Sequence, residues 1–175
     1  MFSVTRWSPL GDVAVLLLAT TLVASAAGAT QATAKDSNTY TWFGELVSLD
    51  NTALTVKARV AYPQAIAELK QFKPGERVWV MWSGVLDYSD AVRQIRQAEP
   101  GHKIDEKLVL PAELVSTEAV NQYVTLRITV PESSAAAIRA VKPGEWVTVT
   151  SRHRPATESE AVVAVAPYGS TVNVD

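Results

Sequence analysis

The chain has 175 residues, a formal net charge of −2 and no cysteine. This length supports one domain or two small ones, and the nearly neutral charge argues against a nucleic-acid partner. Without cysteine the chain has neither a disulfide framework nor a cysteine nucleophile, so its hydrophobic core alone must stabilise the fold.

The first 29 residues are predicted to be a signal peptide. An apolar run from Val13 to Ala24 follows a short polar start, and it is too short to span a bilayer comfortably. Small residues come next in the pattern that signal peptidases recognise, so we expect cleavage after Ala26 or Ala29. An uncleaved membrane anchor is the alternative. Cleavage would give a periplasmic or secreted protein that has no membrane association.

The next predicted elements are strands and one short helix. In residues 54–60 apolar side chains occupy every second position, which predicts a strand with one face in the core. After Pro63 the apolar spacing becomes three, which predicts a short helix. The Lys-Pro-Gly at 73–75 ends this helix in a turn, where Gly75 takes a positive φ. Strands are then expected over residues 78–80 and 91–96.

The same order of elements recurs in the second half of the chain. The phrase KPGERVWV at 73–80 returns as KPGEWVTV at 142–149. Three more blocks return in the same order, namely ELVS at 45–48 and 113–116, LTVKARV and VTLRITV at 54–60 and 124–130, and SDAV and SEAV at 89–92 and 159–162. We therefore predict a tandem duplication of a strand–strand–helix–strand–strand unit. The units are residues 30–98 and 107–175, joined by a linker at 99–106 in which Pro100 and Gly101 break the periodicity.

Two stretches carry a resemblance to a known family, GELVSLDNTALTVKA at 44–58 and FKPGERVWVMWS at 72–83. They resemble small exported barrels of the oligonucleotide/oligosaccharide-binding (OB) type, nearest the periplasmic copper chaperones of the Cus efflux system. The resemblance implies a mainly β fold with short helices and one OB-like small barrel in each unit. That family binds copper through a histidine, methionines and a tryptophan. Here His102, His153 and Met81 do not share a strand at ligand spacing, so we expect no metal or other cofactor.

The strand VWVMW at 78–82 is apolar on both faces, which predicts that both faces are covered. We expect Trp79 to pack between the two units and to be more deeply buried than Trp146. The alternative is that Trp79 forms the floor of a ligand groove. Trp82 and Trp42 are either core residues or ring surfaces for a sugar or a partner protein.

The most cationic stretch is SRHRP at 151–155. Arg152, His153 and Arg154 could bind a carboxylate, a phosphate or an acidic polymer, and the two arginines share a face if the segment is extended. The alternative is a solvated loop that follows a strand.

No set of residues predicts an enzyme. The chain contains no G-x-S-x-G and no H-E-x-x-H motif, and no pair of carboxylates is singled out by its position. We therefore expect an exported, non-catalytic binding or structural protein. Its partner would be another protein or a small anionic or carbohydrate ligand. Periplasmic metal handling is the alternative function, and a small hydrolase is the third.

Overall fold

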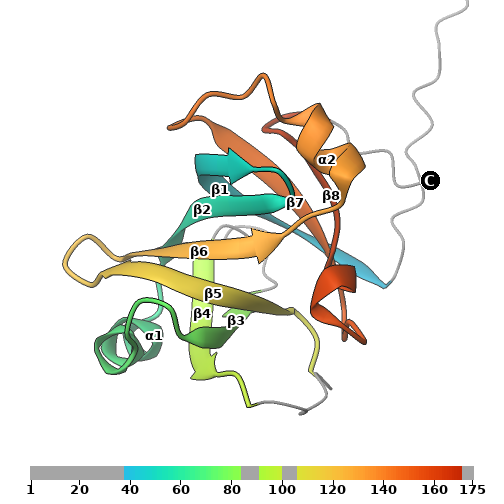
Figure 1. The fold of residues 1–175 in the computed structure, drawn as a ribbon. Coiled ribbons are helices and arrows are strands. Elements are labelled where there is room, and N and C mark those ends of the chain that lie inside the picture. Colours follow the sequence, from blue (N-terminus) through green and yellow to red (C-terminus); the bar gives the residue numbers. More distant parts are fainter. Residues whose placement is uncertain (1–37, 84–90, 100–105, 171–175) are drawn as a thin grey trace, which may run out of the picture. The chain divides into compact units, whose positions relative to one another are not determined.

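The computed structural model describes residues 38–83, 91–99 and 106–170, which form a mainly β fold with short helices (Figure 1). The predicted signal peptide and most of the predicted linker lie outside the described residues. The elements are β1 (Thr39–Asp50), β2 (Ala53–Val60), α1 (Pro63–Glu68), β3 (Arg77–Trp82), β4 (Ala91–Gln97), β5 (Val109–Glu118), β6 (Tyr123–Thr129), α2 (Glu132–Ala137), β7 (Trp146–Arg152) and β8 (Val162–Pro167). Short 3₁₀ turns follow α1 (Leu69–Gln71) and precede β8 (Glu158–Glu160).

The predicted mainly β fold is confirmed. The order strand, strand, helix, strand, strand occurs twice along the chain. Buried and partly exposed positions alternate strictly along β2, as expected for a strand with one face in the core. Both helices begin beside a proline: Pro63 is the first residue of α1, and Pro131 precedes the first residue of α2. Proline is tolerated at the start of a helix because the N–H groups of the first turn have no partner within the helix.

All eight strands form one sheet, in the order β4-β3-β5-β6-β2-β1-β7-β8, and β4 also pairs in parallel with β2. The β4–β2 pairing closes β2, β6, β5, β3 and β4 into a five-stranded barrel, which is consistent with an OB-like fold. The barrel takes strands from both halves of the chain, whereas the sequence predicted one barrel in each unit. Apolar alternation identifies the core face of a strand but not its neighbours, so the pattern could not show this exchange.

The two repeated phrases KPGE and ELVS contact each other across the halves. The Gly75 N–H donates to the Leu114 carbonyl over 2.8 Å, and the Gly144 N–H donates to the Leu46 carbonyl over the same distance. The third strand of each half then runs beside the first strand of the other half, as β3 beside β5 and β7 beside β1. The two repeated phrases thus form the same joint once in each direction between the halves.

Each ELVS phrase also contains a β-bulge. The pairing register shifts between Leu46 and Ser48 in β1, and again between Leu114 and Ser116 in β5. The extra residues, Val47 and Val115, are 40% and 38% exposed. A bulge lets one strand bend where it changes neighbours, which is what β1 and β5 do at these positions.

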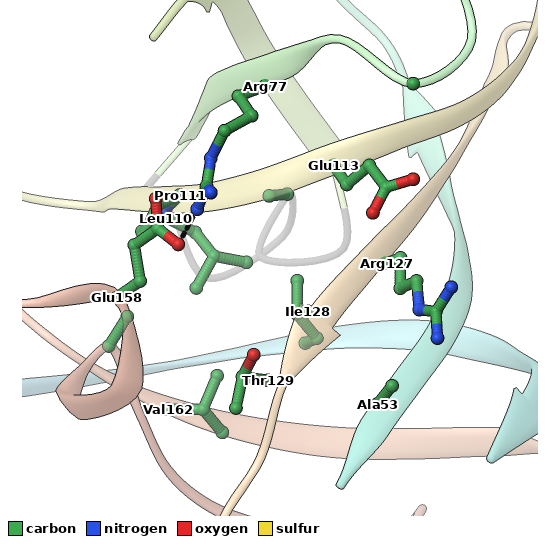
Figure 2. A pocket seen from close by; sticks show the side chains of 13 residues that line it. Ala53, Arg77, Leu110, Pro111, Glu113, Arg127, Ile128, Thr129, Glu158 and Val162 are labelled. Carbon is green, nitrogen blue, oxygen red and sulfur yellow. Dashed lines mark ion pairs between the residues drawn. The ribbon is translucent and has the colours of Figure 1, made fainter. Parts of the chain in front are cut away.

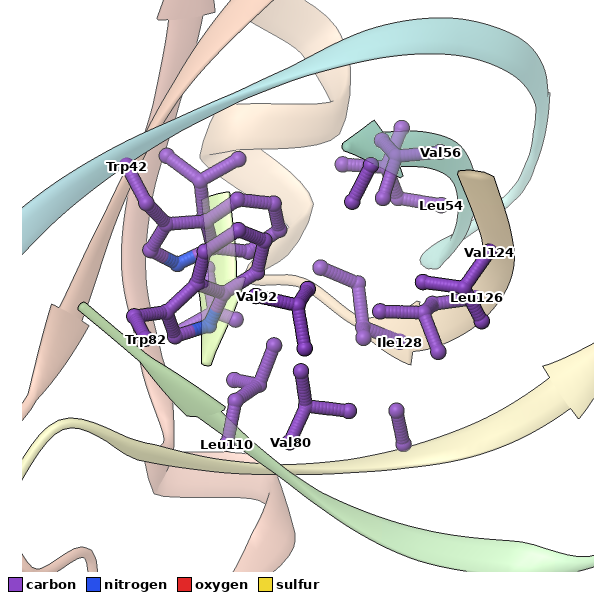
Figure 3. Close-up of a cluster of buried hydrophobic side chains, with 14 of the residues drawn as sticks. Trp42, Leu54, Val56, Val80, Trp82, Val92, Leu110, Val124, Leu126 and Ile128 are labelled. Carbon is purple, nitrogen blue, oxygen red and sulfur yellow. The ribbon is translucent and has the colours of Figure 1, made fainter. Parts of the chain in front are cut away.

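One buried hydrophobic cluster is shared by both halves (Figure 3). Val56 of β2 lies directly opposite Leu126 of β6, and the repeat offset relates these same two positions. Trp42 and Trp82 stack with their ring centroids 4.2 Å apart. Residues 70 positions apart, such as Val56 and Leu126, and 40 positions apart, such as Trp42 and Trp82, thus pack in the same core.

The helices cover backbone edges of the fourth strand in each half. In the first half the Ile95 N–H donates to a carboxylate oxygen of Glu68 over 3.0 Å, and in the second the Val165 N–H donates to the Ser134 hydroxyl over 3.1 Å. A covered edge is protected from pairing with another chain. In the part of the chain that is described, neither helix has the length or apolarity to cross a bilayer.

Candidate functional site

A pocket of about 290 Å³ lies where β5, β6 and the start of β8 meet (Figure 2). We call it the seam pocket. Its volume lies near the lower end of the range for small-ligand sites. Its lining residues are Ala53, Gly75, Arg77, Leu110, Pro111, Ala112, Glu113, Arg127, Ile128, Thr129, Glu158, Ala161 and Val162.

Three apolar side chains lie behind the polar rim of the seam pocket. Leu110 of β5, Ile128 of β6 and Val162 of β8 are each at most 3% exposed. They point toward the core because strand side chains alternate between faces. Thr129, the last residue of β6, is exposed and adds a hydroxyl to the lining.

The rim of the seam pocket carries charges of both signs. Arg77, at the start of β3, makes an ion pair with Glu158 in the 3₁₀ turn before β8 (Figure 2). Glu113 and Arg127 face each other in the β5–β6 pairing on the other side of the pocket. The Arg77 and Glu158 side chains are 63% and 50% exposed, so their pairing contributes little to stability.

The seam pocket occupies a position where the two halves differ. In the first half, Arg59 and Val60 of β2 pair in parallel with Ala91 and Val92 of β4. The repeat offset of 70 relates these residues to Thr129, Val130, Ala161 and Val162. Within the described residues β6 and β8 make no such pairing, and three of these four residues line the pocket instead.

Trp79 is half-buried on the face of β3 that points away from the core. It lies opposite Arg96 of β4 and Pro111 of β5. Trp79 and Trp146 are both half-buried, so the expectation that Trp79 is more deeply buried than Trp146 stays a prediction. Met81, two positions further along β3, is 8% exposed, and its sulfur accepts a hydrogen bond of 3.3 Å from the Arg96 guanidinium.

Trp82 lies in the core, 1% exposed and stacked on Trp42. The Trp42 indole N–H donates to the Ser151 hydroxyl over 2.9 Å, whereas the buried Trp82 indole nitrogen has no hydrogen-bond partner in the described structure. These rings therefore offer no surface to a ligand outside the protein.

The residues of the cationic stretch lie at the end of β7. Arg152 and Arg154 are exposed, and Arg154 has a left-handed backbone with φ 52°. The extended segment that would align the two arginines on one face therefore does not continue to Arg154. His153 stacks on Tyr40 with ring centroids 5.0 Å apart, and its Nδ1 accepts the Leu108 N–H over 3.3 Å.

Tyr40, which stacks on His153, is buried. Desolvation by burial raises the pKa of its phenol well above the usual range, and the neighbouring Ser151 hydroxyl opposes the shift. That hydroxyl accepts a hydrogen bond from Trp42, and within residues 38–83, 91–99 and 106–170 no partner of good geometry satisfies the Tyr40 oxygen. Buried polar atoms without partners are uncommon in folded proteins.

Sequence reasoning did not identify the residues of the seam pocket. The one available signal was the difference between the halves, since the second half has Thr129 where the first has Arg59. Comparison of the chain with protein-family models, with curated proteins and with solved structures finds no match. The geometry of the described residues is therefore the basis for any functional proposal.

Proposed function

We propose that the protein is an exported, non-catalytic binding protein and that its ligand enters the seam pocket. The supporting observation is that the two halves of the chain differ in strand pairing at this position. A strand pairing fills this position in the first half, whereas an open pocket occupies it in the second. Sites for small ligands are usually concave and carry a few polar groups that orient the ligand.

The charges at the rim favour a ligand without a large net charge. Arg77 is already paired with Glu158, and Arg127 lies beside Glu113. A group that enters the pocket would lie beside the Thr129 hydroxyl, and its polar ends would meet a charge of either sign at the rim. Binding of this kind needs no reacting group.

A substitution that fills the pocket tests this proposal. Thr129 is exposed and lines the pocket, so Thr129→Trp places an indole in the opening without replacing a core residue. Ala140→Trp, at an exposed position that does not line the pocket, is the matched control. Ligand-observed NMR with a library of small apolar fragments should detect binding to the wild type and the control, and loss of that binding in Thr129→Trp. Fragments that bind all three proteins equally, or none of them, would refute the pocket as the site.

Metal handling by a copper chaperone of the Cus type is the function that the family resemblance implies. Within residues 38–83, 91–99 and 106–170, no group of three histidine, aspartate or glutamate side chains could hold a metal ion. Met81 is in contact with Arg96, a cation that disfavours a second cation nearby. Nothing in this part of the chain favours metal handling over the binding of an apolar ligand.

A further inference from the structure

We propose that the seam pocket receives an extended segment of a partner protein, which pairs in parallel with the end of β6 as β4 pairs with β2. This inference rests on the proposed function and names its class of ligand. Addition of a strand to an open edge is a common mode of peptide recognition.

The first argument concerns the backbone of β6. Its pairing with β5 ends at Arg127, opposite Glu113, while its pairing with β2 continues to Thr129. Continued register would bring Thr129 opposite Pro111, which has no N–H to donate. Among the described residues, the edge of β6 at Thr129 therefore has no strand partner on the side of the pocket. Backbone polar groups in such a place require a partner.

The second argument is the occupant of the corresponding position in the first half. There β2 separates from β1 in the same way, and Ala91 and Val92 of β4 fill the opening by parallel pairing with Arg59 and Val60. Val92 is fully buried and packs in the shared core (Figure 3). A partner strand on β6 would similarly direct one aliphatic side chain into the seam pocket.

The third argument is that the pocket suits other ligand classes less well. Sugars are typically held against aromatic rings, and no aromatic residue is among those that line the pocket. A small anion would have to displace Glu158 from Arg77. An extended segment satisfies the β6 edge, places one side chain in the pocket and directs its alternate side chains to the charged rim.

The sequence of β4 supplies a probe, because this strand already fills the corresponding opening. The probe is the acetylated and amidated peptide AVRQIRQ, which copies residues 91–97, titrated into the folded full-length protein. Backbone NMR shifts should be concentrated at Ile128, Thr129 and Val162. A peptide with aspartate in place of the valine should bind about tenfold more weakly or worse, since the carboxylate would lose its hydration on entering the pocket.

Two further comparisons separate strand pairing from simple hydrophobic contact. N-methylation of the peptide amides that face β6 should abolish binding, whereas methylation of the alternate amides should not. Thr129→Trp should abolish binding and Ala140→Trp should leave it unchanged. Equal binding of both N-methylated series, or shifts at Arg59 and Val60 that show exchange with β4 itself, would overturn the inference. If fragments occupy the pocket but the peptide does not bind, the inference fails while the proposed function stands.

Discussion

At the scale of single residues, the buried polar atoms around Trp42 have the clearest energetic consequences. The Tyr40 side chain is 6% exposed, and its hydroxyl has no hydrogen-bond partner of good geometry among the described residues. A buried hydroxyl in this state costs free energy, because it loses its hydrogen bonds with water and the neighbouring Ser151 hydroxyl replaces them only in part. Its ionised form would cost more, which is why burial raises the pKa of Tyr40.

Tyr40→Phe should therefore leave the free energy of unfolding at neutral pH unchanged or raise it by about 1 kcal/mol. The effect on alkaline stability should be larger. The phenol stays protonated in the folded state, while in the unfolded state it ionises near pH 10, so wild-type stability falls as the pH rises past about 10. Tyr40→Phe removes this contribution, and urea unfolding at about pH 7.5 and about pH 10.5 measures it.

Tyr168→Phe is the matched control for this comparison. Tyr168 is 61% exposed, so its hydroxyl is solvated in both states and the variant should keep the pH dependence of the wild type. The prediction fails if Tyr40→Phe and the wild type lose the same stability between the two pH values.

At the scale of elements, the duplicated joint between KPGE and ELVS determines how the halves meet. Each joint needs a glycine with a positive φ, 88° at Gly75 and 91° at Gly144. An added Cβ at either position would meet no atom within 4 Å, so the requirement for glycine comes from the backbone alone. Each glycine N–H also donates the 2.8 Å hydrogen bond that holds the turn against the other half.

Gly75→Ala and Gly144→Ala should each lower the free energy of unfolding by about 1 kcal/mol, because a left-handed backbone is unfavourable for alanine. The two losses should be similar, since the joints have the same hydrogen bonds, and they should add in the double variant. Gly75→Asn is the control and should lose less, because asparagine tolerates this conformation. Urea titrations of the four variants test the prediction, and a loss at only one of the two glycines would contradict it.

At the scale of the whole described fold, the halves exchange strands. β3 of the first half pairs with β5 of the second, and β7 of the second half pairs with β1 of the first. β2 and β6 pair at the centre. Neither half can complete its sheet without the other. The single hydrophobic core likewise draws on both halves, with Trp42 and Val56 from one and Leu110 and Leu126 from the other.

Two fragments separated within residues 99–106 should therefore not fold alone as monomers, and mixing them should restore the fold. Each isolated fragment would expose apolar surface that the intact chain buries, and that loss exceeds the marginal stability of a small domain. Circular dichroism and sedimentation of each fragment, alone and mixed in equal amounts, measure the outcome. A cooperative thermal transition in a monomeric isolated fragment would contradict the exchange of strands as a folding requirement.

The sequence alone determined the local elements of this protein. Alternation over 54–60 and 124–130, the three-residue spacing after Pro63 and the glycine turns depend on neighbours a few positions away, so strands, helices and turns could be predicted. The repeated phrases also showed that the two halves share one order of elements. The signal peptide over residues 1–29, the tandem duplication and the domain boundaries stay predictions.

Only the tertiary structure decided which strands pair and where a pocket remains. A period of two identifies the buried face of β3 but not whether β1 or β5 lies beside it, because that choice depends on packing between residues far apart in the sequence. For the same reason the half-burial of Trp79 and the stacking of Trp82 on Trp42 could not be read from composition. In the described residues β4 pairs with β2 while β8 does not pair with β6, and the seam pocket lies where that second pairing is missing, although the two halves have the same pattern.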